Sequence, residues 1–271
     1  MNGAGIRVAL FIGQPVDKAR TPAAFDAWAR ATGTAARMLP LSVDPGALAA
    51  TLTALRGWDN ALGAVVTFPH KAAAMAHLDV ACDVARFTGA CNVIRREEDG
   101  RLVGAMTDGI GCIGAAAAGG ARLAGADMVL VGAGGAGSAI AHEAARRGVA
   151  RLVISDLDTA RAADLRTRLG AAFPELALPE DTPADFAHDI LCNATPLGMM
   201  GEVAHPWSLD RCHANSLVID VVPTPAMTPW LTAAAARGLR VQTGPEMVAA
   251  QFGHVTGHLM GVAPDALPVA R

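Results

Sequence analysis

Short apolar runs alternate along the chain with alanine-rich segments of helical length. The runs are rich in valine, isoleucine and leucine and contain few polar residues, which is typical of strands buried on both faces of a parallel sheet. The strand-like runs lie at 7–13, 61–68, 128–134, 151–156, 189–195 and 216–222, and helix-like segments lie at 22–33, 72–87 and 137–148. This alternation predicts an α/β fold built from parallel sheets with crossover helices.

A stretch of glycines and small residues, "TDGIGCIGAAAAGGARLAG" at 107–125, suits a helix that lies between two lobes. A chain of 271 residues is long enough for two ordinary domains, each with its own core. We therefore expect a first domain of residues 1–106, completed by the C-terminal segment 242–271, and a second domain of residues 107–241.

Charge and cysteine content narrow the classes of partner. The 22 Lys and Arg residues nearly balance the 25 Asp and Glu residues, which argues against a nucleic-acid partner or an anionic membrane surface. Mean hydropathy is +0.33, but prolines interrupt the uncharged stretch 221–236, and glutamine, histidines and glycines interrupt 247–264. Five scattered cysteines without a C-x-x-C pair indicate neither a disulfide framework nor a metal site. A cytoplasmic location fits this composition.

A glycine-rich loop, "GAGGAG" at 132–137, follows one strand-like run and opens a helix-like segment. In this position glycines permit a tight turn and let backbone N–H groups approach a pyrophosphate at the helix N-terminus. The next strand-like run ends on Asp156, whose carboxylate can accept both ribose hydroxyls of NAD and would repel a 2′-phosphate. The alternative is an ordinary strand-to-helix turn in a glycine-rich chain. The predicted NAD-binding residues of the loop are Gly132, Ala133, Gly134, Gly135, Ala136 and Gly137.

Five stretches together resemble motifs of the shikimate/quinate dehydrogenase family. They are "GQPVDKARTP" (13–22), "VVTFPHK" (65–71), "GACNVI" with "GAMTDGIG" (89–111), "NATPLGM" (193–199) and "GPEMVAAQ" (244–251). The resemblance implies an N-terminal α/β substrate domain followed by a Rossmann dinucleotide-binding domain. It also implies an NAD-dependent oxidoreductase that transfers hydride reversibly between NAD and a secondary alcohol of a shikimate-like cyclic hydroxy acid.

The resemblance implies that Lys71 and Asp108 are the catalytic pair. Oxidation of a secondary alcohol by hydride loss needs a group that takes the hydroxyl proton, and a lysine beside a carboxylate can do so. A purely structural salt bridge between the two residues is the alternative.

The same resemblance implies the remaining contacts. The residues that it places against the substrate are Thr21, Thr67, Asn92 and Gln251. The residues that it places against the cofactor, besides the glycine loop, are Asp156, Arg161, Asn193, Thr195, Val221 and Gly244, with Asp83 nearby. Leu157 stands where NADP-dependent members carry an arginine, which favours NAD.

Several substrate positions depart from the family pattern. Ala19 and Thr21 stand where shikimate-binding members have two serines, and Val65 and Met106 replace asparagines. Pro223 stands in place of a tyrosine, and the chain contains no tyrosine. A small hydroxy acid therefore remains the expected partner, while the acid itself is left open, as is a homodimer. The lost contacts also leave open a non-catalytic NAD-binding sensor or regulator on the same scaffold.

Overall fold

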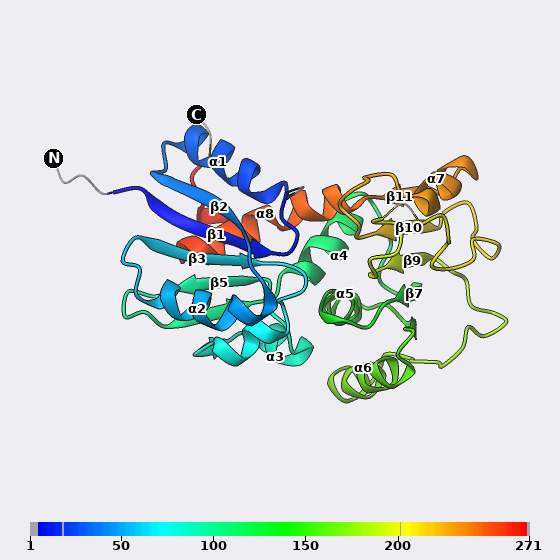
Figure 1. The fold of residues 1–271 in the computed structure, drawn as a ribbon. Coiled ribbons are helices and arrows are strands. Elements are labelled where there is room, and N and C mark those ends of the chain that lie inside the picture. Colours follow the sequence, from blue (N-terminus) through cyan, green and yellow to red (C-terminus); the bar gives the residue numbers. More distant parts are fainter. Residues whose placement is uncertain (1–4, 18, 201, 270–271) are drawn as a thin grey trace. The chain divides into compact units, whose positions relative to one another are not determined.

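The computed structural model describes residues 5–17, 19–200 and 202–269, and the chain divides into two compact units (Figure 1). The first unit runs to Thr107 and resumes at Phe252, and the second comprises Asp108–Gln251. Each unit has a sheet with helices, so the expected α/β class is confirmed. The second unit extends to Gln251 rather than to residue 241, because strand β11 (Arg240–Gln242) pairs with its sheet and helix α8 (Gly244–Met260) begins in it.

The first unit contains a six-stranded mixed sheet in the order β2-β1-β3-β5-β6-β4. Its strands are β1 (Arg7–Gly13), β2 (Ala36–Ser42), β3 (Ala61–Val66), β4 (Val80–Ala81), β5 (Val93–Arg96) and β6 (Leu102–Ala105). Strand β1 is parallel to both neighbours, but β5 is antiparallel to β3 and β6. The expectation of a wholly parallel sheet is therefore wrong here. A tight turn joins β5 to β6, in which the Gly100 N–H donates to the Glu97 carbonyl over 2.9 Å.

The helix expected over 72–87 is also wrong, because this segment is interrupted by a strand. A short 3₁₀ helix (Ala73–His77) is followed by β4 and then by helix α3 (Asp83–Thr88). The interruption follows from pairing with β6, since the Asp79 N–H donates to Leu102 and the Cys82 N–H donates to Gly104. The Asp79 carboxylate accepts the Leu102 N–H in return, over 2.7 Å. These long-range bonds outweigh the helix propensity of the alanines.

The core of the first unit lies between its sheet and two helices that are far apart in the sequence. Helix α1 (Thr21–Thr32) contributes Phe25, and the C-terminal half of α8 contributes Val255 and Leu259, to a cluster that also contains Phe11. Helix α2 (Leu48–Arg56) buries its leucines. Both ends of the described chain therefore take part in this unit.

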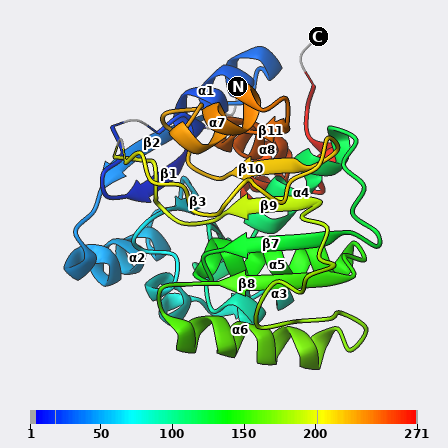
Figure 2. The same cartoon turned by 90° about the vertical axis from the view of Figure 1, so that its right-hand side faces the viewer.

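The second unit contains five parallel strands in the order β11-β10-β9-β7-β8, seen side by side in Figure 2. The strands besides β11 are β7 (Asp127–Val131), β8 (Arg151–Ser155), β9 (Ile190–Asn193) and β10 (Leu217–Asp220). The helices that begin in this unit are α4 (Asp108–Ala118), α5 (Gly135–Arg146), α6 (Thr159–Ala172), α7 (Pro229–Ala236) and α8. The strand order reverses between β7 and β9, and the carboxyl ends at such a switch point are where open α/β sheets bind ligands.

Candidate functional site

The glycine loop connects β7 to α5, and its glycines differ in how closely neighbouring atoms approach the place where a Cβ would lie. Gly132 has φ +101°, which favours glycine, and a Cβ there would lie 2.9 Å from Cγ2 of Thr195. A Cβ on Gly137 would overlap the carbonyl oxygen of Gly132. Gly134, the residue before α5, has no atom within 4 Å of the place where a Cβ would be. The turn is therefore tight at Gly132 and Gly137 and has open space beside Gly134, at the N-terminus of α5.

Asp156 is held beside this loop by backbone donors. Its Oδ2 atom accepts the N–H of Ala133 over 2.7 Å, and its Oδ1 atom accepts the N–H of Asp158 over 2.9 Å. The Arg161 guanidinium lies 3.7 Å from Asp156 and 3.3 Å from Asp158. The intervening Leu157 side chain is fully exposed. The carboxylate is thus fixed next to the glycine turn, and the adjoining side chain offers no positive charge.

Asn193, at the end of β9, is completely buried and bonded to protein. Its Nδ2 donates to the Leu197 carbonyl over 3.2 Å and to Oδ1 of Asp220 over 3.1 Å. Its Oδ1 accepts the N–H and the hydroxyl of Thr195, over 3.0 and 2.6 Å. Through these bonds, the Asn193 side chain holds the segment that contains Thr195 in place.

Asp220 ends the neighbouring strand β10, and motif matching gave it no role. Its carboxylate accepts the Val222 N–H over 3.0 Å and the Thr228 hydroxyl over 2.8 Å. Burial raises the pKa of Asp220, while the hydrogen bonds from Val222, Thr228 and Asn193 oppose the rise. The Val221 N–H donates to the Asn193 carbonyl, and a Cβ on Gly244 would overlap the Val222 carbonyl oxygen. Val221 and Gly244 therefore lie close to each other beside the carboxyl ends of β9 and β10.

In the first unit, Thr67 and Lys71 follow the carboxyl end of β3. The Thr67 N–H donates to the Ile12 carbonyl over 2.8 Å, which keeps this residue next to β1. The Lys71 carbonyl accepts the N–H of Cys91 over 3.0 Å. Burial raises the pKa of the Cys91 thiol to about 12, and the positive charge of Lys71 opposes that rise. The lysine thus lies close to a buried thiol that stays protonated.

Asn92 and Thr107 form a buried pair directly before Asp108. Asn92 Nδ2 donates to the Thr107 hydroxyl over 2.9 Å, and Asn92 Oδ1 accepts the Thr107 N–H over 2.9 Å. Asp108 is the first residue of α4 and is itself buried. The Asn92 amide therefore fixes the backbone from which the Asp108 side chain projects.

Comparison with known proteins extends over nearly the whole chain. Residues 11–94 match a family model described as the shikimate dehydrogenase substrate binding domain. A shikimate dehydrogenase (NADP(+)) from Lysinibacillus sphaericus is 32% identical, over 94% of this chain and 92% of the relative. The chain belongs to the shikimate dehydrogenase family. It is an NAD(P)-dependent oxidoreductase of that type, and the resemblance inferred from the motifs is confirmed.

Solved structures of similar proteins show that shikimate dehydrogenase relatives differ in substrate. A 5-ketofructose reductase from Gluconobacter sp. is 28% identical with a TM-score of 0.83, covering 96% of this chain and 95% of that one. A quinate dehydrogenase from Corynebacterium glutamicum in complex with NAD is 30% identical with a TM-score of 0.81, covering 94% of each chain.

Several positions where this member of the shikimate dehydrogenase family departs from the family pattern are apolar and packed. Ala19 is partly buried against the core cluster of the first unit, which includes Val65. Met106 is 2% exposed. Lys18, within the first motif, lies outside the described residues. Pro223 follows the end of β10 and is partly exposed.

The remaining predicted residues are separated between the units. Thr21 is the first residue of α1 in the first unit. Gln251 lies on α8 in the second unit, where a Cβ on Gly111 would be 2.7 Å from its own Cβ. Asp83 is exposed and forms an ion pair with Arg86. Among the residues that the structure describes, no three His, Cys, Asp or Glu side chains are grouped to hold a metal ion, and no helix is long and apolar enough to cross a membrane.

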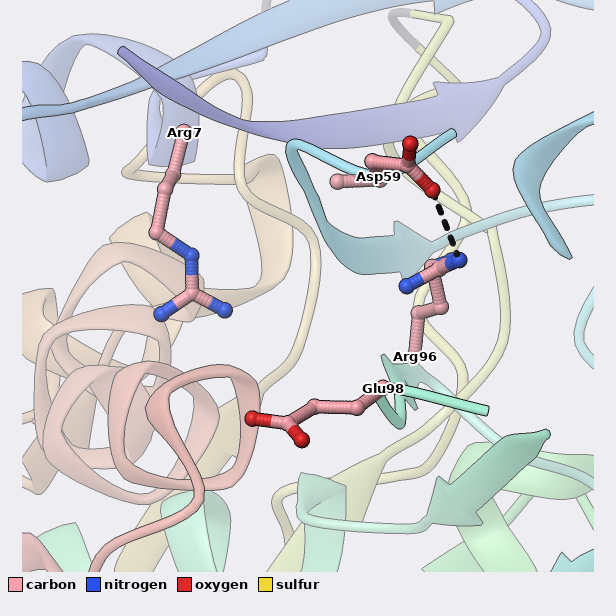
Figure 3. A pocket seen from close by; sticks show the side chains of 5 residues that line it. Arg7, Asp59, Arg96 and Glu98 are labelled. Atoms are coloured by element: carbon pink, nitrogen blue, oxygen red, sulfur yellow. Dashed lines mark ion pairs between the residues drawn. The ribbon is translucent and has the colours of Figure 1, made fainter. Parts of the chain in front are cut away.

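A pocket of about 370 Å³ lies elsewhere in the first unit (Figure 3). Arg7, Asp59, Ala61, Arg96 and Glu98 line it, and Arg96 pairs with Asp59 at 3.7 Å. Arg7 and Ala61 begin β1 and β3, so this pocket lies at the opposite strand ends from Thr67. It is therefore separate from the candidate site of this shikimate dehydrogenase relative.

Proposed function

We propose that the protein oxidises a secondary alcohol of a cyclic hydroxy acid reversibly, and that it uses NAD in preference to NADP. The observation that carries the cofactor choice is the Asp156 carboxylate, held 2.7 Å from the Ala133 N–H of the glycine turn, with the uncharged Leu157 exposed beside it. A carboxylate accepts ribose hydroxyls and repels a 2′-phosphate.

The residues of the second unit fit a dinucleotide. The open space over Gly134 accommodates the pyrophosphate at the N-terminus of α5, and Arg161 lies along the adenine side. Thr195, Val221 and Gly244, which follow the carboxyl ends of β9, β10 and β11, contact the nicotinamide side. The bound cofactor supplies a hydride acceptor.

The substrate and proton contacts in this proposal come from residues of the first unit, together with Asp108 and Gln251 of the second. Lys71 takes the hydroxyl proton during oxidation and returns it during reduction, and Asp108 positions the lysine. Thr67, Asn92 and Gln251 hydrogen-bond the other hydroxyls of the ring, because neutral groups that both donate and accept suit a polyol. Thr21 contacts the acid group.

The test of this function is a substrate panel assayed in both directions. Shikimate, quinate and related cyclic hydroxy acids are supplied with NAD or NADP, and 5-ketofructose is supplied with the reduced cofactors. Steady NADH production with a cyclic hydroxy acid supports the proposal. Cofactor binding without turnover of any hydroxy acid would favour the non-catalytic sensor instead, for which none of the similar proteins gives support.

Cofactor preference provides a quantitative prediction. NAD is expected to bind at least about tenfold more tightly than NADP, or ~1.4 kcal/mol, by calorimetry. Asp156→Asn combined with Leu157→Arg should narrow the gap, because the changes remove a negative charge and add a phosphate partner. Asp158→Asn is the matched control, since Asp158 pairs with the same Arg161. Equal affinity of the wild type for both cofactors would contradict the assignment.

Shikimate is expected to be a poor substrate, chiefly through a raised KM. Ala19 cannot donate a hydrogen bond to the shikimate carboxylate, and a hydrogen bond to a charged group contributes roughly 1.5–3 kcal/mol, so kcat/KM falls by up to about a hundredfold. Ala19→Ser with Thr21→Ser should improve shikimate oxidation through KM more than through kcat, because the carboxylate is remote from the reacting carbon.

The neighbouring Arg20 provides the control for this pair. It precedes α1 and its side chain makes no capping bond. Steady-state kinetics should show little change in KM for Arg20→Ala. A strongly raised KM in that variant, or no gain in the double serine variant, would show that the acid is bound in another way.

A further inference from the structure

A chain of buried hydrogen bonds joins the ends of β10 and β9. Asp220 and Asn193 are 1% and 0% exposed, and Asn193 Nδ2 donates to Asp220 Oδ1 over 3.1 Å. The other end of the same amide accepts the Thr195 N–H and hydroxyl. The Asp220 carboxylate, together with the Leu197 carbonyl, therefore orients the Asn193 amide, because an amide whose nitrogen is fixed on one side must present its oxygen on the other.

The segment held in this way borders the glycine turn. Thr195 Cγ2 would lie 2.9 Å from a Cβ on Gly132, so the two residues are packed together. The same Asp220 oxygen also accepts the Val222 N–H, which fixes the segment that contains Val221. Its second oxygen accepts the Thr228 hydroxyl, which also caps α7. One carboxylate thus links two of the segments assigned to the cofactor.

We propose that Asp220 is a positioning residue of the cofactor site, acting through Asn193 on Thr195 and directly on the segment that contains Val221. This inference rests on the proposed binding of a nicotinamide dinucleotide by the second unit. Without the carboxylate, the Asn193 amide nitrogen keeps only its bond to the Leu197 carbonyl, so more of the ordering of the Thr195 segment must take place when the cofactor binds. Ordering at that step weakens binding.

The principal test measures the Kd of the purified protein for NADH by fluorescence titration, with kcat at saturating cofactor measured on the same samples. Asp220→Ala is expected to weaken NADH binding by about tenfold and to change kcat less. Thr228→Val is the matched control, because it removes the other hydrogen bond to the carboxylate and the α7 cap. It should lower Tm while leaving the Kd within about twofold of wild type.

A double-mutant cycle tests the route through Asn193. In the Asn193→Ala background, where the amide is absent, Asp220→Ala should weaken NADH binding less than it does in the wild type. The remaining loss arises from the Val222 contact. If the losses of NADH affinity in the two single variants simply add in the double variant, action through Asn193 is contradicted. An unchanged Kd in folded Asp220→Ala, or an equal loss in Thr228→Val, would overturn the proposal.

If Asp220→Ala does not fold, a pair of larger substitutions decides the question by the same measurement. Asp220→Asn keeps the acceptor position and loses the charge, so its Kd should stay within about threefold of wild type. Asp220→Glu keeps the charge but displaces the carboxylate by one methylene, so it should bind NADH more weakly. The opposite order, or equal affinities, would refute a positioning role. Failure of the proposed dinucleotide binding is distinguishable, because the wild type would then not bind NADH, and failure of turnover alone would leave the Kd comparison valid.

Discussion

Replacement of Lys71 by alanine is expected to lower kcat at least about 10²-fold while leaving the Kd for NAD nearly unchanged. Lys71 belongs to the first unit, whereas the glycine turn and Asp156 belong to the second. Loss of the proton carrier slows the chemical step and leaves the predicted dinucleotide contacts intact. Steady-state kinetics on the substrate identified by the panel, together with calorimetry of NAD binding, measure the two effects separately.

A second substitution separates proton transfer from an ion pair. Lys71→Arg keeps a positive charge, but arginine does not lose its proton under assay conditions, since its pKa exceeds about 12. It should therefore be nearly as inactive as Lys71→Ala. Recovery of most of the activity in Lys71→Arg would support the structural salt bridge with Asp108 instead, and full turnover in Lys71→Ala would refute the catalytic assignment.

Gly137→Ala is expected to reduce NAD affinity by at least about tenfold and to lower Tm. A Cβ on Gly137 would overlap the carbonyl oxygen of Gly132, which is backbone and has no rotamer by which to move away. Forcing additional atoms into a packed site costs about 1–3 kcal/mol, and relief of the overlap requires the turn itself to shift. Thermal unfolding and calorimetry of the purified variant measure both consequences.

Gly114→Ala provides the control for this substitution. Gly114 also lies within a helix of the second unit, but no atom is within 4 Å of the position that its Cβ would take. Alanine favours the helix over glycine by roughly 1 kcal/mol, so Tm should stay the same or rise while the NAD affinity is unchanged. Equal behaviour of the two variants would show that the close approach at Gly137 does not matter for binding.

The sequence predicts the second unit well because its signals are local. An apolar run, a glycine turn and a helix follow one another within β7 and α5, and the next run forms β8. The strands of this unit are buried on both faces of one parallel sheet, and burial on both faces produces continuous apolar runs in the sequence. The order of strand-like and helix-like segments along the chain is therefore enough to predict most of the fold of this unit.

The first unit is less predictable because its strand pairs depend on distant partners. Strand β4 has only two residues, and its extended backbone is stabilised by bonds to β6 that no local pattern indicates. The β5–β6 hairpin does have a local signal, Asp99-Gly100, which is typical of tight hairpin turns. This dipeptide would have indicated the antiparallel pair.

The contribution of Asp220 could not be inferred from the sequence for a related reason. Its partners Asn193 and Thr228 lie on either side of it in the chain, and the Asn193 contact arises because β9 and β10 are neighbours in the sheet. An acidic residue at the end of an apolar strand is visible in the sequence. Which amide it will orient depends on strand order, which the apolar pattern does not specify.

The division of α8 between the two units has a consequence for biosynthesis. Val255 and Leu259 pack in the same cluster as Phe11 and Phe25, although the whole second unit separates them in the sequence. During translation, the strands of the first unit are therefore made long before the helix that covers them, whereas residues 108–251 form a continuous unit. The second unit can complete its core first. Until α8 emerges from the ribosome, the apolar surface of the first unit that α8 covers stays exposed to chaperones and to aggregation.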